Sequence, residues 1–165
     1  MEKGVENISD VTKEVSKLNE LIGDSYQVTR RLGLGGMGAV YAARCHKSGR
    51  TVALKILCPT SGSDLTPKAR FKREFRLCAA LDNPLVIKHY DMGELADGRL
   101  FITMEYLEHG SLRQVIDREG ALEEKRVLSL SIELARALSV VHKNGLIHRD
   151  LKPDNILLRK DGTPI

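Results

Sequence analysis

Three glycines with G-x-G-x-x-G spacing stand between two runs that read as β-strands, and this arrangement limits the possible folds most strongly. Residues 26–32 alternate with the period of a β-strand, and residues 39–43 repeat the strand pattern directly after Gly33, Gly35 and Gly38. Glycines at this spacing let backbone N–H groups approach an anion, but a hairpin without a ligand explains them equally well. A dinucleotide-binding fingerprint needs a helix after the glycines. The second strand pattern therefore favours a strand–loop–strand unit.

A third strand is predicted at residues 51–57, and it carries one charged side chain among apolar neighbours. Lys55 follows the apolar run Val52-Ala53-Leu54 and precedes Ile56. Burial of a lysine is costly unless the ammonium group is paired. The alternative interpretation is a lysine on the exposed face of an edge strand. The strand pattern alone leaves both interpretations open.

The next predicted element is a helix that begins at Thr66-Pro67, a typical N-cap followed by proline in the first turn. Asn83-Pro84 ends the helical segment. Glu74 lies at the margin of the apolar stripe of this helix, where its carboxylate could simply point into solvent. It is also the only acid between Asp64 and Asp82. Glu74 is therefore the natural partner for Lys55.

The remaining periodicity predicts two more strands and then helices. Strands are expected at 86–92 and 100–106, joined by a turn at 96–98, and Ser111 is expected to cap a short helix. A long helix is predicted over 124–143. Its apolar stripe, expected to belong to the core, consists of Val127, Leu130, Leu134, Leu138 and Val141.

Close to the end of the sequence, His148-Arg149-Asp150-Leu151-Lys152-Pro153-Asp154-Asn155 concentrates polar side chains before an apolar run. A carboxylate, an ammonium group and a carboxamide gathered this tightly suit proton acceptance, phosphate neutralisation and metal coordination. One such loop proves little by itself. Its meaning depends on whether the rest of the chain supplies matching parts.

Residues 5–22 form a leader with helical periodicity, in which apolar residues recur three and four positions apart. The pattern covers only about two heptads, fewer than a coiled coil requires. A helix that docks on the domain, or a partly ordered leader, is favoured over a helix that dimerises, and the sequence does not decide between them. Gly23 and the residues after it break the pattern before the strands begin.

Composition narrows the functional classes. The net charge is +4. Aromatic residues make up only 4% of the chain, so few side chains are available to stack on nucleic acid bases. We therefore expect no nucleic acid partner. The three cysteines, Cys45, Cys58 and Cys78, form no C-x-x-C pair, and their apolar surroundings predict buried or inert thiols in a reducing compartment. With no spanning segment or signal region in the visible chain, a cytoplasmic location is expected, and a membrane anchor beyond residue 165 is compatible with it.

Five features agree in order and spacing, and together they resemble the eukaryotic-type protein kinases. They are the glycine motif with Val40, the strand Val52-Ala53-Leu54-Lys55, Glu74, the segment Met104-Glu105-Tyr106-Leu107, and residues 148–155. The version Leu-Gly-x-Gly-Gly-Met-Gly is similar to the bacterial serine/threonine branch. The resemblance covers about residues 26–165.

The resemblance implies an α+β fold and a division of the chain into three parts. Residues 1–25 would form the leader, residues 26–106 a small lobe with a five-stranded antiparallel sheet and one helix, and residues 107–165 the hinge and the beginning of a helical large lobe. It further implies ATP and Mg²⁺ as cofactors and a protein with Ser or Thr hydroxyls as substrate. A homodimer or a partner kinase is a further possibility that it leaves open.

Roles for individual residues also follow from the resemblance. Gly33, Gly35 and Gly38 would cover the ATP phosphates. Lys55 would hold the α- and β-phosphates and pair with Glu74. The residues implied around adenine are Leu32, Val40, Ala53, Leu157, the gatekeeper Met104, and the hinge backbones of Glu105 and Leu107.

In the loop, Asp150 would accept or orient the substrate hydroxyl proton, and Asn155 would bind Mg²⁺. Lys152 is similar to the lysine of serine/threonine kinases that stabilises the transferring phosphoryl group. Arg149 is similar to the arginine that pairs with the phosphorylated residue of an activation loop.

The sequence departs from the family pattern at its end, because the family continues to Asp-Phe-Gly soon after the position of Ile165. Without that second metal ligand, we expect the 165-residue chain alone to transfer phosphate negligibly, with no label above a Lys55→Met control. An apolar stripe left open on the long helix also predicts marginal stability. The alternative function is a non-catalytic module that binds nucleotide or a partner kinase.

Overall fold

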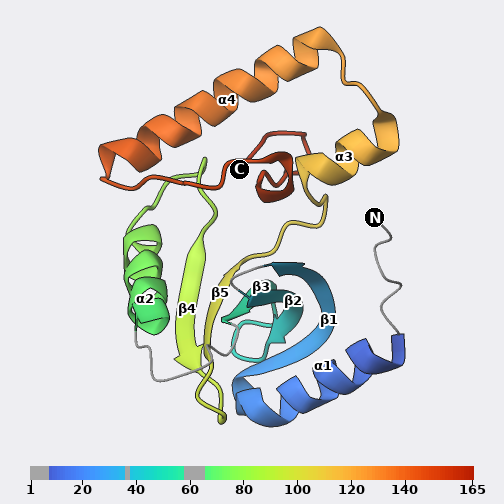
Figure 1. Cartoon of the computed structure of the whole chain (residues 1–165), viewed down its shortest axis with the longest axis vertical. Coiled ribbons are helices and arrows are strands. Elements are labelled where there is room, and N and C mark those ends of the chain that lie inside the picture. The colour runs from blue at the N-terminus through green and yellow to red at the C-terminus, as the bar shows by residue number, and fades with distance from the viewer. Residues whose placement is uncertain (1–7, 36–37, 58–65) are drawn as a thin grey trace. The chain divides into compact units, whose positions relative to one another are not determined.

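The computed structural model describes residues 8–35, 38–57 and 66–165, and Figure 1 shows the course of the chain. The helices are α1 (Ile8–Ile22), α2 (Thr66–Ala79), α3 (Leu112–Glu119) and α4 (Glu124–Lys143), with short 3₁₀ turns η1 (Gly23–Ser25) and η2 (Pro153–Asn155). The strands are β1 (Tyr26–Gly35), β2 (Gly38–Cys45), β3 (Thr51–Leu57), β4 (His89–Glu94) and β5 (Leu100–Glu105). The side chain of Glu74 lies outside the described part, as do Cys58 and Asp64.

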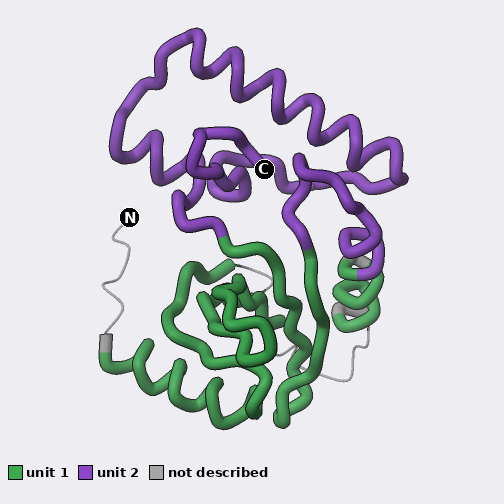
Figure 2. Tube along the Cα trace, turned by 180° about the vertical axis from the view of Figure 1, so that it is seen from behind, with its two compact units in different colours: residues 1–75, 89–106 green, residues 76–88, 107–165 purple. Residues whose placement is uncertain are grey.

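The chain divides into two compact units, coloured separately in Figure 2. Unit 1 consists of residues 1–75 and 89–106, and unit 2 consists of residues 76–88 and 107–165. Unit 1 holds the sheet and α1, whereas unit 2 holds α3, α4 and the loop of residues 148–155.

Unit 1 is built on one five-stranded sheet with the order β1-β2-β3-β5-β4, and every neighbouring pair is antiparallel. The α+β architecture and the five-stranded antiparallel sheet predicted from the sequence are confirmed. The turn between β4 and β5 closes with a hydrogen bond from the Leu95 N–H to the Arg99 carbonyl, and Gly98 adopts a φ of 81° there. β3 occupies the centre of the sheet, which places Lys55 on a central strand rather than on an edge.

The register divides the side chains of the sheet between two faces, because successive residues of a strand point to opposite sides. One face carries Tyr41, Leu54 and Phe101, which are almost fully buried in the larger core of the unit. The opposite face carries Val40, which is the direct cross-strand neighbour of Lys55. The larger core is thus separated from the face that carries the lysine.

α1 covers the core face of the sheet, as Figure 1 shows along β1. Leu18 is 2% exposed and belongs to the core, and Val15 and Leu21 pack against it. The side chain of Asn19 donates to the Val28 carbonyl at 3.0 Å and accepts from the Val28 N–H at 2.7 Å, so it pairs with β1 much as a neighbouring strand would. The expected helix is therefore present from Ile8 to Ile22, and it docks on the sheet of its own chain.

On the face that carries Lys55, α2 contributes a second and smaller core. Phe71 is buried with Leu100 and Ile102, and Phe75 packs against the same group. These aromatic residues lie four positions apart on α2 and so share one side of the helix. The smaller core thus packs α2 against the face of the sheet that carries Lys55.

Unit 2 forms around a cluster contributed by its helices and the segment after η2. Leu112, Val115, Leu130, Ile156 and Leu158 are its buried members. Ser111 caps α3 as predicted: its hydroxyl accepts from the Gln114 N–H at 3.4 Å, and the Gln114 side chain accepts from the Ser111 N–H at 3.0 Å. This reciprocal capping box satisfies two N–H groups that the helix itself leaves free.

Two expectations about the helices and strands are corrected. The strand predicted to begin at residue 86 begins at His89, because the Asn83 side chain and carbonyl bind the N–H groups of Leu85 and Val86 and hold this stretch in a turn. The predicted stripe of α4 is only partly core: Leu130 is buried, whereas Val127 is 46% exposed. None of the helices in the described part of the chain is both long and apolar enough to cross a membrane.

Candidate functional site

The first group of predicted site residues lies at the turn between β1 and β2. Gly33 is paired with Val40, and Gly35 is paired with Gly38, so the ladder continues to the end of both strands. Leu32 is left without a register partner between Arg31 and Gly33, where the pairing shifts. Such a bulge bends the strand that leads into the glycines.

The described residues give no steric or conformational reason for glycine at positions 33 and 35. Neither adopts a positive φ. A Cβ atom added to Gly33 would meet nothing within 4 Å, and one added to Gly35 would meet only the Gly38 carbonyl oxygen, at 3.8 Å, an ordinary contact distance. Other residues would therefore fit here without strain or collision with the described residues. Glycine at these positions leaves the backbone open to close approach by a group from outside the chain.

Lys55 stands on the central strand, half-buried between Val40 of β2 and Ile102 of β5. Ala53 lies two residues earlier on the same face, and it is paired with Met104. Val40, Ala53, Lys55 and Met104 therefore share one face of the sheet. A cation placed among apolar neighbours at the middle of a sheet suits an anionic ligand.

The other residues predicted to act with this face are placed less completely. Glu74 is located on α2, but its side chain lies outside the described part, so its predicted pairing with Lys55 stays a prediction. Glu105 ends β5 in unit 1, opposite Val52. Leu107 and Leu157 belong to unit 2, where both are half-buried.

The second group forms a compact cluster in unit 2 around the carboxylate of Asp150. The Nζ atom of Lys152 donates to Oδ2 of Asp150 at 2.9 Å, and Nδ2 of Asn155 donates to the same oxygen at 2.9 Å. The Asn155 Nδ2 atom also donates to the Asp150 carbonyl at 2.8 Å. The structure thus brings together the three residues that the sequence singled out in this loop.

These contacts set the charges of the cluster. Hydrogen bonds from Lys152 and then from Asn155 hold the pKa of the Asp150 carboxyl below its usual value, and the positive charge of Lys152 adds to the effect. The same carboxylate raises the pKa of the Lys152 ammonium group. At neutral pH the cluster therefore presents an ionised carboxylate beside a protonated amine, both open to solvent.

The local backbone explains how the loop holds this shape. Arg149 has a φ of 64°, a conformation that residues other than glycine rarely adopt, and it precedes Asp150 directly. Pro153–Asn155 form the turn η2, in which the Asn155 N–H donates to the Lys152 carbonyl at 2.9 Å. Such strained residues persist only where the surrounding structure fixes them, and they concentrate at functional sites.

The segment after the loop is anchored in the core of unit 2. The Leu112 N–H donates to the Ile156 carbonyl at 2.8 Å, and the Leu158 N–H donates to the Gly110 carbonyl at 3.0 Å. Leu157 exchanges backbone hydrogen bonds with Ile165 at 3.1 and 2.9 Å. Asn155 is therefore positioned by Ile156 and Leu158, which belong to the buried cluster of unit 2.

We tested whether these residues fit a magnesium ion. Within residues 8–35, 38–57 and 66–165, no group of three or more His, Cys, Asp or Glu side chains is arranged to hold a metal. Mg²⁺, however, is commonly bound through one or two protein oxygens together with water and substrate phosphates. Both Asn155 hydrogen bonds use Nδ2, so its amide oxygen is the atom that can face a cation. Asn155 fits as a single oxygen ligand.

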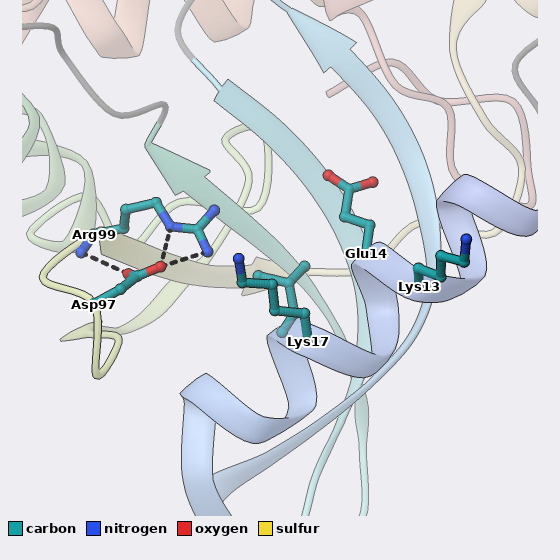
Figure 3. Close-up of a pocket in the computed structure, with 6 residues that line it drawn as sticks. Lys13, Glu14, Lys17, Asp97 and Arg99 are labelled. Atoms are coloured by element: carbon teal, nitrogen blue, oxygen red, sulfur yellow. Dashed lines mark hydrogen bonds and ion pairs between the residues drawn. The ribbon is translucent and has the colours of Figure 1, made fainter.

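A pocket of about 510 Å³ lies elsewhere on unit 1, as shown in Figure 3, and includes none of the predicted site residues. It is lined by Lys13, Glu14, Lys17 and Leu18 of α1 and by Asp97 and Arg99 of the turn between β4 and β5. The charges of that turn are already matched, because Arg99 Nη2 lies 2.8 Å from Asp97 Oδ2. The carboxylate of Asp97 and the guanidinium of Arg99 therefore neutralise each other at this side of the pocket.

One contact near the glycines was missed by sequence reasoning. Glu14 of α1 binds both Arg31 of β1 and Tyr41 of β2. The one weak signal for this contact in the sequence is the position of Glu14, an acid beside the apolar stripe of the leader helix. Its two partners become visible only when the register of β1 and β2 is known.

Comparison with known proteins agrees with this geometry. Residues 26–165 match the family model described as the protein kinase domain. The chain is 40% identical over 145 residues to a protein of Clostridium perfringens named "probable serine/threonine-protein kinase". The aligned residues make up 88% of this chain and 21% of that protein. It is 41% identical over 141 residues to serine/threonine-protein kinase pkn3 of Myxococcus xanthus, covering 86% and 26% of the two chains.

A third relative is serine/threonine-protein kinase PknB of Mycobacterium tuberculosis, which is 37% identical over 140 residues, or 83% of this chain and 22% of that one. The chain thus spans about a quarter of the length of these curated relatives. The aligned part contains the whole sheet and the loop of residues 148–155.

Proposed function

Because the chain belongs to the protein kinase domain family, we propose that it serves the transfer of the ATP γ-phosphoryl group to serine and threonine hydroxyls of proteins. The observation that carries the proposal is the cluster in which Lys152 and Asn155 both bind one oxygen of Asp150. A carboxylate, a cation and an amide at these distances match the needs of a hydroxyl nucleophile and a transferring phosphoryl group.

In this proposal Asp150 binds and orients the substrate hydroxyl. Its lowered pKa makes it a weak base, so its main contribution is to align the oxygen and to take the proton as the new O–P bond forms and the bond to ADP breaks. Lys152 stays protonated beside it and stabilises the negative charge on the phosphoryl oxygens.

Unit 1 is proposed to bind the nucleotide. The backbone of Gly33, Gly35 and Gly38 would approach the phosphates, which explains glycines that packing does not require. Lys55 would hold the α- and β-phosphates with Glu74 as its partner. Within unit 1, adenine contacts are proposed for Leu32, Val40, Ala53, Met104 and the Glu105 backbone. Within unit 2, they are proposed for the Leu157 side chain and the Leu107 backbone.

Asn155 is the residue proposed to hold Mg²⁺ through its amide oxygen. When bound, the ion supplies charge neutralisation for the phosphates. The two Nδ2 hydrogen bonds of Asn155 keep its amide in one orientation, so the amide oxygen is fixed relative to the Asp150 carboxylate.

The preference for serine and threonine is proposed from Lys152 and from the relatives, which are named serine/threonine kinases. The partners are then proteins that present such hydroxyls. A cytoplasmic site of action is proposed because the reaction uses ATP and because Cys45 is a free thiol, as a reducing compartment would keep it.

The test is to incubate the product of the complete open reading frame with Mg²⁺ and γ-labelled ATP and a basic protein, and to identify the labelled amino acids. We expect phosphoserine and phosphothreonine, and no label with Lys55→Met. Nucleotide binding without any transfer would contradict the proposal and support a non-catalytic binding module. Label on tyrosine alone would contradict the assignment of the substrate.

A further inference from the structure

A helix outside the region matched by the family model is tied to the two strands that carry the glycines. Glu14 of α1 accepts a hydrogen bond from the Tyr41 hydroxyl at 2.6 Å through Oε1 and one from Arg31 Nη1 at 2.9 Å through Oε2. Arg31 and Tyr41 are register partners on β1 and β2, and the next pair toward the turn is Gly33 with Val40. One carboxylate therefore joins both strands immediately before the glycines.

The contact is shielded from water on the strand side. Tyr41 is 2% exposed, and the Arg31 side chain is 14% exposed, whereas Glu14 is 37% exposed. Burial, reinforced by the hydrogen bond to Glu14, raises the pKa of the Tyr41 phenol. The hydroxyl therefore remains protonated and donates to the carboxylate at any physiological pH. A charge-assisted contact in such surroundings is stronger than an ordinary surface ion pair.

The ladder between β1 and β2 needs support at this position. Its register shifts between Val28 and Arg30 and again between Arg31 and Gly33, so Arg31 stands between two irregularities. A bulge leaves a residue unpaired and bends the strand. The orientation of β1 and β2 where they reach the glycines then depends on contacts that Arg31 and Tyr41 make with residues outside the two strands.

α1 is firm enough to provide this support. Leu18 is buried one turn after Glu14, and Asn19 makes two hydrogen bonds to the backbone of Val28. Its last turn is held as well, because the Ala96 N–H donates to the Leu21 carbonyl at 3.1 Å. Figure 3 shows Glu14 extending from α1 toward the neighbouring strands, where its oxygens bind Arg31 and Tyr41.

We propose that Glu14 is a positioning residue for phosphate binding: through Arg31 and Tyr41 it fixes the strands that carry Gly33, Gly35 and Gly38. The inference rests on the proposed function, in which these glycines approach the ATP phosphates. It adds that α1, which precedes the matched residues 26–165, is part of the nucleotide-binding machinery. A change in the position of α1 would then alter affinity for the phosphates.

The experiment compares the affinities of ATP and adenosine for the wild-type protein, Glu14→Ala and the control Glu20→Ala. Glu20 is an exposed glutamate on the same helix. Loss of the two hydrogen bonds should weaken ATP binding about three- to tenfold. Adenosine binding should change less than twofold in both variants, because adenosine has no phosphates, and Glu20→Ala should bind both ligands like the wild type.

Two further variants separate positioning from folding. Tyr41→Phe removes only the hydroxyl that donates to Glu14 and should weaken ATP binding in the same direction, which keeps the test available if Glu14→Ala does not fold. Glu14→Gln keeps one acceptor oxygen and should lose less affinity than Glu14→Ala. Equal weakening of ATP and adenosine, or no weakening in Tyr41→Phe, would overturn the inference alone. A wild-type protein that binds neither ligand would overturn the proposed function and this inference with it.

Discussion

The Nζ atom of Lys152 lies 2.9 Å from Oδ2 of Asp150, with both side chains open to solvent, at 49% and 63% exposure respectively. An ion pair this exposed contributes little to the stability of a protein. Its consequence is chemical, because it keeps a carboxylate ionised next to a cation. The reaction proposed for this loop depends on that combination.

The pH dependence of Asp150 should report this contact. In the wild type, hydrogen bonds from Lys152 and Asn155 lower its pKa, so the carboxyl group should titrate below the ordinary value of about 3.9. Because the folded pKa is depressed, the stabilisation from this group is present above the unfolded pKa and is lost as the pH falls through the folded pKa.

The measurement is the carboxyl carbon resonance of Asp150, followed by NMR between pH 6 and pH 2 (a range chosen about the reference value). Lys152→Met should move the midpoint upward, toward or past the ordinary value, while Lys160→Met, which removes an exposed lysine outside the loop, should leave it in place. An unchanged midpoint in Lys152→Met would show that the lysine does not control the carboxylate.

Gly33→Ala should weaken ATP binding without lowering the free energy of unfolding. The added methyl group meets nothing within 4 Å, and the φ of Gly33 is not positive, so the free energy of unfolding should stay the same or rise by about 0.4–1 kcal/mol. ATP affinity should fall about tenfold if phosphates approach this backbone. Chemical denaturation and calorimetric titration on the same preparations check both effects. Gly120→Ala, at a φ of 76°, is a contrasting control that should lose stability without losing ATP affinity.

Lys55→Met should weaken ATP binding by about 10- to 100-fold, because it removes a charged hydrogen-bond donor from the face of β3 that carries Val40 and Met104. Methionine keeps the length of the side chain and packs well among apolar neighbours, so the folded protein should keep its stability. Lys47→Met, at an exposed position after β2, serves as the control and should bind ATP like the wild type. Equal affinities in Lys55→Met and Lys47→Met would contradict the role given to Lys55.

The docking of α1 makes a prediction about stability. Leu18→Ala should lower the free energy of unfolding by about 2–5 kcal/mol, because Leu18 is 2% exposed in the larger core of unit 1. Leu128→Ala is the matched control, since Leu128 is 61% exposed on α4 and its loss should change stability by no more than about 0.5 kcal/mol. Equal effects in a denaturant titration would show that α1 does not pack on the sheet in solution.

Local patterns were sufficient to predict most of the elements. β3 was predicted at its observed bounds, Thr51–Leu57, because its short and mostly apolar run follows directly on turn residues. α4 was also predicted at its observed bounds, Glu124–Lys143. The start of β4 was wrong because the side chain of Asn83 competes for backbone N–H groups, a contact that apolar periodicity does not report.

Burial and long-range contacts were harder to predict. The apolar stripe of α4 was assigned to the core on periodicity, yet periodicity says only that a face could be buried and not what covers it. The carboxylate of Glu14 could not be joined to Arg31 and Tyr41 without the register of β1 and β2. In the loop of residues 148–155 the partners are neighbours in sequence, so its cluster could be predicted.

The central claim is that Asp150 takes part in phosphoryl transfer rather than in nucleotide binding. The direct test is the rate of γ-phosphoryl transfer to a protein substrate at saturating ATP, measured for the wild-type product of the complete open reading frame and for Asp150→Asn. We predict that the rate falls by about 10²- to 10⁴-fold while ATP affinity stays within twofold. Transfer at the wild-type rate by Asp150→Asn would contradict the claim.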